Sequence, residues 1–203
     1  MIEQIILVRH GETEHNLAGI AQGWTDSALS PLGRKQVTGL AARVSALRPD
    51  ALFSSPLGRA RASAEIIAQA TRLEIRFLDD LREMSYGGWE GKSFLDVRRD
   101  DHEIYQRWIA DADVASPGGE SHNDVLRRMQ SAIKSIREGD GAEYLRPIVV
   151  SHGTAIRIAA TVLLEAPIEV SRSLAQDNAS FNLFIRRGER LILKVWNDTT
   201  HCR

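Results

Sequence analysis

The chain of 203 residues lacks the features of several special classes of protein. Its one cysteine is Cys202, so an internal disulfide is impossible and no oxidising compartment is required. The first apolar run covers residues 5–8 and continues directly into Arg9 and His10, which makes it too short for a signal peptide or a membrane span. We therefore expect a cytoplasmic protein with no membrane partner.

Neither sign of charge is in excess, because 26 lysines and arginines stand against 27 aspartates and glutamates. The formal net charge of -1 provides no overall field for nucleic acid, so any anion must be bound by local residues. Low-complexity tracts, fixed-period repeats and long linkers rich in proline, glycine or serine are also missing. These absences favour a single domain over residues 1–203 and argue against a nucleic-acid partner.

Motifs of metal and nucleotide sites are absent as well. The six histidines form no HExxH sequence and no close cluster with cysteine, and Arg9 beside His10 would repel a cation. A phosphate-binding loop of the Walker type and a glycine-rich dinucleotide motif are also missing. We therefore expect no metal ion and no other cofactor, and nucleotide-dependent kinase chemistry has no support.

What the sequence does contain is an alternation of short apolar runs with longer amphipathic segments. Four runs are typical of strands in a parallel sheet: 5–8, 51–54, 75–77 and 148–151. Four segments have helical spacing of apolar residues: 31–47, 57–70, 121–137 and 154–164. Residues 181–186 and 190–196 predict a hairpin. The predicted fold is α/β, a three-layer single domain with a mainly parallel central sheet and helices on both faces.

Charged and polar residues gather where three of the predicted strands end. The segments LVRHGET at 7–13, SSPLGRA at 54–60 and VSHGT at 150–154 each include or follow such an end. Open parallel sheets bind ligands beyond the carboxyl ends of their strands, so these segments are expected to meet. Together they would place two histidines and two arginines around one point. A phosphoryl group suits that point, because guanidinium groups orient its oxygens while an imidazole nitrogen attacks phosphorus.

These segments resemble the signatures of a known family. LVRHGET, SSPLGRARASAE, LREMSYGGWEG and VVSHG, with PGGES and a closing NDTTH, are similar to motifs of the histidine phosphatase superfamily, in the branch that contains cofactor-dependent phosphoglycerate mutases and related phosphatases. An RHG triplet alone would be weak evidence, whereas several spaced matches over nearly the whole chain are specific. The resemblance implies a phosphoglycerate mutase-like fold and phosphoryl transfer through a phosphohistidine.

The same resemblance implies a role for each matching residue. His10 is expected to be the nucleophile, Arg9 and Arg59 to hold the phosphoryl oxygens, and His152 to stabilise charge on the transferring group from the opposite side. Glu83 is expected to be the general acid and base. The substrate-binding residues are expected to be Asn16, Gln22, Gly23, Tyr86 and Gly153.

Chemistry adds a requirement for the nucleophile, because a histidine attacks phosphorus only when it is neutral. Its second ring nitrogen should then donate to a fixed acceptor, such as a backbone carbonyl near Gly11. His15, His102 and His122 are interpreted as surface residues. His201 belongs either to a solvated tail or, by the resemblance, to a tail that folds back near the site.

Hydrolysis is preferred to phosphoryl shuttling. A mutase must hold a doubly phosphorylated intermediate and exclude water, which requires further cationic ligands and a covering segment. The mutases of the family are longer, with an insertion after the glutamate motif that this chain lacks. We therefore expect a phosphatase that acts on small phosphate monoesters, with a phosphoglycerate mutase as the alternative. A non-catalytic phosphate-binding module is a third hypothesis, which the intact His10 and Glu83 disfavour.

Residues 84–120 are expected to form a variable cap over the pocket. Five residues of this segment are candidates for its wall: Arg98, Arg99, Tyr105, Arg107 and Trp108. Basic residues there would suit a small phosphorylated metabolite such as a phosphoglycerate or a sugar phosphate, and a solvated helical face is the alternative. A homodimer is expected only by analogy with relatives.

Overall fold

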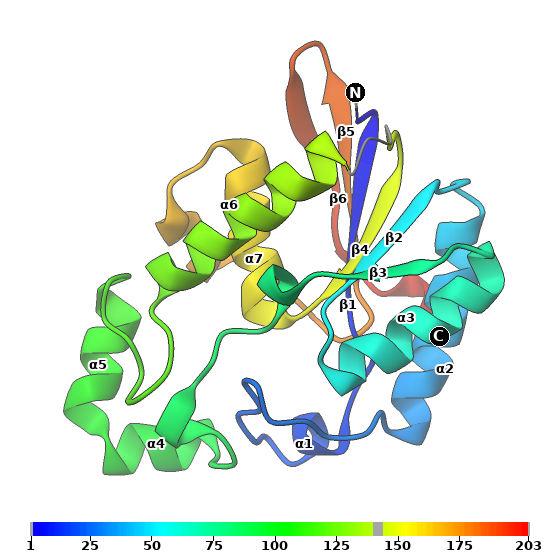
Figure 1. Ribbon diagram of the computed structural model, residues 1–203. Helices are drawn as coiled ribbons and strands as arrows, with labels where there is room; N and C mark the ends of the chain where they lie inside the picture. Colours follow the sequence, from blue (N-terminus) through cyan, green and yellow to red (C-terminus); the bar gives the residue numbers. More distant parts are fainter. Residues whose placement is uncertain (1, 140–143, 203) are drawn as a thin grey trace.

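The computed structural model describes residues 2–139 and 144–202, and a six-stranded sheet with the order β3-β2-β4-β1-β5-β6 forms its centre (Figure 1). The strands are β1 (Gln4–Arg9), β2 (Ala51–Ser54), β3 (Ile75–Phe77), β4 (Pro147–Ser151), β5 (Phe181–Arg187) and β6 (Arg190–Asp198). The pairs β3-β2, β2-β4 and β4-β1 are parallel, whereas β5 is antiparallel to both of its neighbours. The mainly parallel sheet of the sequence-based prediction is therefore confirmed.

Helices cover the sheet on both faces and also gather at the end toward which β1 runs (Figure 1). The α-helices are α1 (Glu14–Leu17), α2 (Pro31–Ser45), α3 (Gly58–Thr71), α4 (Phe94–Asp100), α5 (His102–Ala110), α6 (His122–Glu138) and α7 (Gly153–Leu164). Short 3-10 turns are η1 (Asp79–Leu81), η2 (Gly87–Trp89), η3 (Ile168–Ser173) and η4 (Thr200–Cys202). None of the helices in this described part of the chain has the length and apolarity to cross a membrane.

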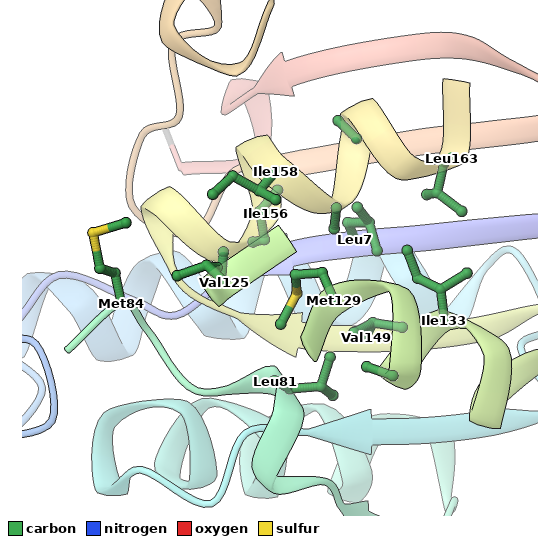
Figure 2. Close-up of a cluster of buried hydrophobic side chains, with 14 of the residues drawn as sticks. Leu7, Leu81, Met84, Val125, Met129, Ile133, Val149, Ile156, Ile158 and Leu163 are labelled. Carbon is green, nitrogen blue, oxygen red and sulfur yellow. The ribbon is translucent and has the colours of Figure 1, made fainter. Parts of the chain in front are cut away.

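The alternation of side chains along β1 divides the core into two layers. Ile6 and Val8 belong to the cluster that includes residues of α2 and α3, whereas Ile5 and Leu7 belong to the cluster that includes residues of α6 and α7. Figure 2 shows part of the second layer, in which residues of α6 and α7 surround Leu7 and Val149. Because both faces of β1, β2 and β4 are buried, the sequences of these three strands are nearly continuous apolar runs.

The predicted helix starts agree with the structure where the sequence carries a cap. The Ser30 hydroxyl accepts from the amide of Gly33 before Pro31 at the first helical position, and Ser121 forms a capping box with Asp124. The sequence-based prediction did not include α1, α4 and α5. These helices have four, seven and nine residues, and such lengths give little periodic signal.

Candidate active site

His10 and His152 face each other because their strands are neighbours. His10 directly follows β1, His152 directly follows β4, and the parallel register pairs Arg9 with Ser151. The centroids of the two imidazole rings are 5.2 Å apart, with their planes inclined by 59°. Both rings are buried, with exposed fractions of 2% and 0%. The two histidines that the sequence indicated therefore form one pair at the carboxyl edge of the sheet.

A hydrogen bond fixes the tautomer of His10. Its Nδ1 lies 2.7 Å from the carbonyl oxygen of Gly11, and since a carbonyl only accepts, Nδ1 carries the proton. Burial, with the charges of Arg59 and Arg9 as further causes, holds the pKa of His10 well below its usual value. The imidazole is therefore neutral near pH 7, and Nε2 keeps the free electron pair. The expected acceptor near Gly11 is present.

His152 is held by a residue of the second motif segment. Its Nε2 lies 2.8 Å from the hydroxyl oxygen of Ser55, while its buried Nδ1 has no partner among the described residues. Burial and the charge of Arg59 hold the pKa of His152 well below its usual value, as for His10. Because the two imidazoles are neutral and the neighbouring guanidinium groups are positive, the space beside the histidine pair favours a bound anion.

The two arginines are anchored by backbone carbonyls. Arg9 donates from Nη1 to the carbonyl of Gln176. Arg59 donates to the carbonyls of Gly23 and Thr25 at 2.7 and 2.9 Å and pairs with Asp26 at 3.0 Å. Arg59 is 2% exposed, and the Nε atoms of both arginines are buried without a partner in the described part of the chain. These unused donors fit an anionic ligand between them.

Glu83 rests on the amino terminus of α7, which begins directly after His152. Its Oε2 accepts from the amide of Thr154 at 3.1 Å, and its Oε1 accepts from the amides of Ala155 and Met84 at 3.1 and 2.8 Å. The first amides of a helix have no intrahelical partner, so they can bind a carboxylate. The side chain of Glu83 is thereby fixed, with an exposed fraction of 8%.

The backbone around Glu83 is held by Arg128 of α6, which the sequence analysis missed. The guanidinium donates to the carbonyls of Asp80, Arg82 and Glu83, and it pairs with the Glu120 carboxylate at 2.8 Å. Glu120 belongs to the PGGES segment. This motif was the feature of the sequence that could have indicated the role of Arg128, because the Glu120 carboxylate binds the arginine that supports the loop carrying Glu83.

Eight of the ten predicted site residues line one cavity of about 100 Å³: Arg9, His10, Asn16, Gln22, Gly23, Arg59, Glu83 and Tyr86. Gly153 lines an adjacent cavity of about 290 Å³, which shares Arg9, Glu83 and Tyr86 with the first. His152 lines neither cavity and contacts the ring of His10 instead. The first cavity is small and mostly polar in its lining, which suits a phosphoryl group.

The expected substrate-binding residues are fixed by different contacts. The Asn16 Oδ1 accepts from Thr13 and Asn178, which leaves its amide nitrogen as the donor. The hydroxyl of Tyr86 lies 3.1 Å from the hydroxyl of Thr154, and burial raises the pKa of Tyr86 above its ordinary value, so the phenol stays protonated. Gln22 has a buried Oε1 without a partner in the described residues.

A third and larger cavity, of about 470 Å³, lies between α5, α7 and η3 and contains residues that the sequence analysis missed. Arg157 and Arg172 line it, whereas the candidate basic residues Arg98, Arg99 and Arg107 are exposed and line none of these three cavities. Arg157 lies four residues after Gly153 on the same helix, and this spacing could have indicated that the two residues share a helix face.

The surface interpretation of the remaining histidines was wrong in two cases. His102 is exposed as predicted, but His15 is half-buried. His122 is 7% exposed and packs on Trp108, with ring centroids 5.0 Å apart. A histidine at the start of an amphipathic helix was interpreted as solvated, and the packing of α5 against that helix overrode this expectation.

The carboxyl-terminal tail folds back toward the histidine pair. The Nε2 of His201 donates to the carbonyl of Ala179 at 2.8 Å, and the amide of Ala179 donates to the carbonyl of His10 at 2.9 Å. Arg43 bonds Nδ1 of His201 and pairs with Asp198. Of the two interpretations of His201, the folded-back tail is correct, although the contact passes through the backbone rather than the cavity.

No group of three or more histidine, cysteine, aspartate or glutamate side chains within residues 2–139 and 144–202 is placed to hold a metal ion. The site instead brings the guanidiniums of Arg9 and Arg59 and the carboxyl group of Glu83 around two neutral imidazoles. This set can bind and orient a phosphoryl group and offers it one nitrogen nucleophile.

Comparison with known proteins agrees with this description. The chain is 38% identical over 183 residues to a bifunctional protein of Mycobacterium tuberculosis, covering 89% of this chain and 49% of that protein, so it spans about half the length of that relative. It is 36% identical over 181 residues to a probable phosphoglycerate mutase of Escherichia coli, covering 88% and 83% of the two chains. The solved structure of a mycobacterial glucosyl-3-phosphoglycerate phosphatase in complex with VO3 is similar, with a TM-score of 0.87, 30% identity and coverage of 96% and 98%.

The family comparison covers nearly the whole chain. The description of the matching family is histidine phosphatase superfamily (branch 1), and the match extends over residues 5–199. It contains both strand-end histidines, Arg59, Glu83 and the PGGES segment. The protein therefore belongs to branch 1 of the histidine phosphatase superfamily.

Proposed function

We propose that the protein is a phosphatase that hydrolyses small phosphate monoesters through a phosphohistidine on His10. The observation that carries this proposal is the bond from Nδ1 of His10 to the Gly11 carbonyl, since it leaves Nε2 as the one nitrogen of a neutral ring with a free electron pair. Similarity to a phosphatase of known structure supports the class of reaction, and similarity to a probable phosphoglycerate mutase keeps shuttling as the alternative outcome of the test.

In the first half-reaction, Nε2 of His10 attacks phosphorus between the guanidiniums of Arg9 and Arg59. The N–P bond forms while the O–P bond to the alcohol breaks, and the leaving oxygen takes a proton from Glu83. Oε1 of Glu83 already accepts two amide protons and Oε2 accepts one, so Oε2 is the oxygen with capacity for that proton. The two guanidiniums neutralise the phosphoryl oxygens.

In the second half-reaction, water attacks the phosphorus of the phosphohistidine. The carboxylate of Glu83 takes the water proton, the N–P bond breaks, and its electron pair returns to Nε2. Inorganic phosphate leaves, and Glu83 is again protonated for the next turnover. His152 is neutral, and Ser55 binds its Nε2, so the buried Nδ1, which has no partner within the described chain, is the atom of this ring that would contact the transferring group.

The test is incubation with a panel of phosphate esters, phosphoglycerates included, for the wild type, His10→Ala and the control His102→Ala. His102 is exposed at the start of α5, so its replacement should leave activity unchanged. We expect phosphate release by the wild type and the control and none by His10→Ala. Alkaline denaturation during turnover, followed by peptide mass mapping, should place one phosphate on the peptide that contains His10.

Other outcomes contradict the proposal in distinct ways. Phosphate on the peptide that contains His152 would exchange the roles of the two histidines. Interconversion of phosphoglycerates without phosphate release would identify a mutase. Ligand binding without turnover across the panel would identify a phosphate-binding module.

A further inference from the structure

The cavity of about 470 Å³ adjoins the candidate active site, because the two share lining residues. It shares Tyr86 and Phe94 with the cavity that His10 lines, and it shares Tyr86, Thr154 and Arg157 with the cavity that Gly153 lines. A molecule whose phosphate lies at His10 therefore has this space next to its alcohol part. Cavities of about 300–1,000 Å³ are typical of drug-sized ligands, so the space exceeds the needs of a three-carbon acid.

One wall of this cavity is aromatic. Tyr86 packs edge to face on Phe94 at 5.3 Å and on Trp108 at 6.2 Å, and Tyr105 lies 5.9 Å from Trp108, measured between ring centroids. These rings come from α4, α5 and the segment before η2, and each packs on at least one of the others. A rigid wall of this kind is complementary to a flat ring.

The cavity also carries positive charge without a compensating carboxylate. Arg157 donates to the hydroxyl of Thr154 at 3.0 Å, and Arg172 donates to the carbonyl of Ala110 at 3.1 Å. Neither arginine forms an ion pair with a carboxylate in the described part of the chain, and aspartate and glutamate are absent from the described lining. Two guanidiniums with unused donors favour an anionic ligand group.

Two residues of the lining also carry buried polar atoms without a partner among the residues that the structure describes. The indole Nε1 of Trp108 and the Nδ1 of His122 are both buried and have no hydrogen-bond partner among residues 2–139 and 144–202. The two residues are 9% and 7% exposed and line the cavity together. Buried polar groups normally have partners, so this side of the cavity is a place where the hydrogen-bonding groups of the protein are not yet all used.

Resting on the proposed function, we propose that this cavity binds the alcohol part of the substrate, and that this part carries a flat ring together with a carboxylate. The ring packs on the wall formed by Phe94, Tyr105 and Trp108. The carboxylate accepts from Arg157 and Arg172. The substrate is thus a ring-bearing acidic phosphate monoester rather than a short aliphatic one.

Four esters with similar primary alcohol leaving groups separate the two requirements: propyl phosphate, phosphooxypropanoate, benzyl phosphate and para-carboxybenzyl phosphate. We expect kcat/KM to rise when the ring is added and again when the carboxylate is added, with para-carboxybenzyl phosphate highest. Because the leaving groups are alike, the differences report binding in the cavity rather than the chemistry of bond breaking.

Variants then assign the effects to residues. Arg157→Gln should reduce the preference for para-carboxybenzyl over benzyl phosphate roughly tenfold, the size of a lost hydrogen bond to a charged group. Ile109→Glu, which places a negative charge at a residue that is 38% exposed on the lining, should reduce the same ratio. The control Arg107→Gln removes an exposed arginine of α5 outside the cavity and should leave the ratio unchanged.

The outcomes distinguish failure of this proposal from failure of the proposed function. Equal kcat/KM for all four esters, or a ratio unaffected by Arg157→Gln, would overturn the ring-and-carboxylate proposal while hydrolysis at His10 still stood. Absence of phosphate release from every ester would overturn the proposed function. In that case the binding of para-carboxybenzyl phosphate to wild type and to Arg157→Gln, measured by calorimetry, still tests the ring-and-carboxylate proposal. The proposal predicts weaker binding to the variant, and equal binding would overturn it.

Discussion

The ring of His10 lies 5.2 Å from the ring of His152, and neither ring is free to turn, because Gly11 holds the first and Ser55 holds the second. Their relative position therefore depends on the pairing of β1 with β4 and not on mobile loops. In the proposed mechanism, a phosphoryl group that moves onto His10 would therefore meet a nucleophile whose ring is already fixed before reaction. Such preorganisation reduces the reorganisation needed for reaction.

Glu83→Gln should affect substrates according to their leaving groups. We expect kcat to fall about 10²–10⁴-fold for alkyl phosphates, because the leaving oxygen no longer receives a proton. With para-nitrophenyl phosphate, whose leaving group needs no proton, the first half-reaction should remain fast while the attack of water slows. Rapid-mixing measurements should then show a burst of nitrophenolate and accumulated phosphohistidine. Glu90→Gln is a poor control, because Glu90 binds the amides of Trp24 and Thr25.

The pH profile of an Arg59 variant tests the electrostatic state of His10. Arg59 is one cause of the low pKa of His10, so Arg59→Met should raise that pKa. The neutral form is the reactive one, so the acid limb of kcat/KM should move to higher pH than in the wild type, whatever the loss in absolute rate. Arg61→Met, at an exposed position two residues away on α3, should leave the limb unchanged. An unmoved limb in Arg59→Met would contradict the electrostatic account.

His122 should make the protein less stable in mild acid. Burial is the first cause that lowers its pKa from the ordinary 6.5 to about 4, so below pH 6.5 the unfolded chain binds a proton that the folded chain does not. The free energy of unfolding should therefore fall as pH decreases through this window, and His122 should account for about 2 kcal/mol between about pH 7.5 and pH 5. Urea denaturation of wild type and His122→Gln at both pH values measures it, and equal pH slopes would contradict it.

His201→Ala should lower kcat with little change in KM. The tail contacts the backbone of the His10 loop through Ala179, so loss of one neutral hydrogen bond should misplace the nucleophile rather than weaken substrate binding. We expect about a three- to tenfold loss, since such a bond contributes about 0.5–1.5 kcal/mol. His201→Gln, whose amide can donate to the same carbonyl, should recover part of kcat. Lys194→Ala, at an exposed position on β6, is the control.

The fold and the centre of the site were visible in the sequence for the same reason. Strands buried on both faces read as apolar runs, and the polar residues that follow them lie at one edge of a parallel sheet. His10, Arg59 and His152 could thus be placed together from the amino-acid sequence alone. Which loop would supply the carboxylate rested on the resemblance, because Glu83 follows a 3-10 turn and no strand end.

The larger cavity could not be predicted in this way. Its wall combines α4 and α5, which are too short for a periodic signal, with Arg157 and Arg172 from segments more than forty residues later in the chain. The basic candidates of the cap segment, Arg98, Arg99 and Arg107, are instead exposed to solvent, since the buried positions of α4 and α5 are taken by Val97 and Trp108. The sequence shows which residues this segment contains, but it does not show which other segments of the chain pack against them.

The pairing of β1 with β4 also has a consequence for how activity arises during folding. His10 and His152 are separated by 142 positions, and the register that brings them together closes a loop that includes β2, β3 and the helices α1 to α6. Contacts of such long range form slowly, because the entropy of closing the loop opposes them until the intervening elements are in place. Under the proposed function, recovery of phosphate release during refolding should therefore lag behind the recovery of helical circular dichroism, and turnover would report a late step of assembly.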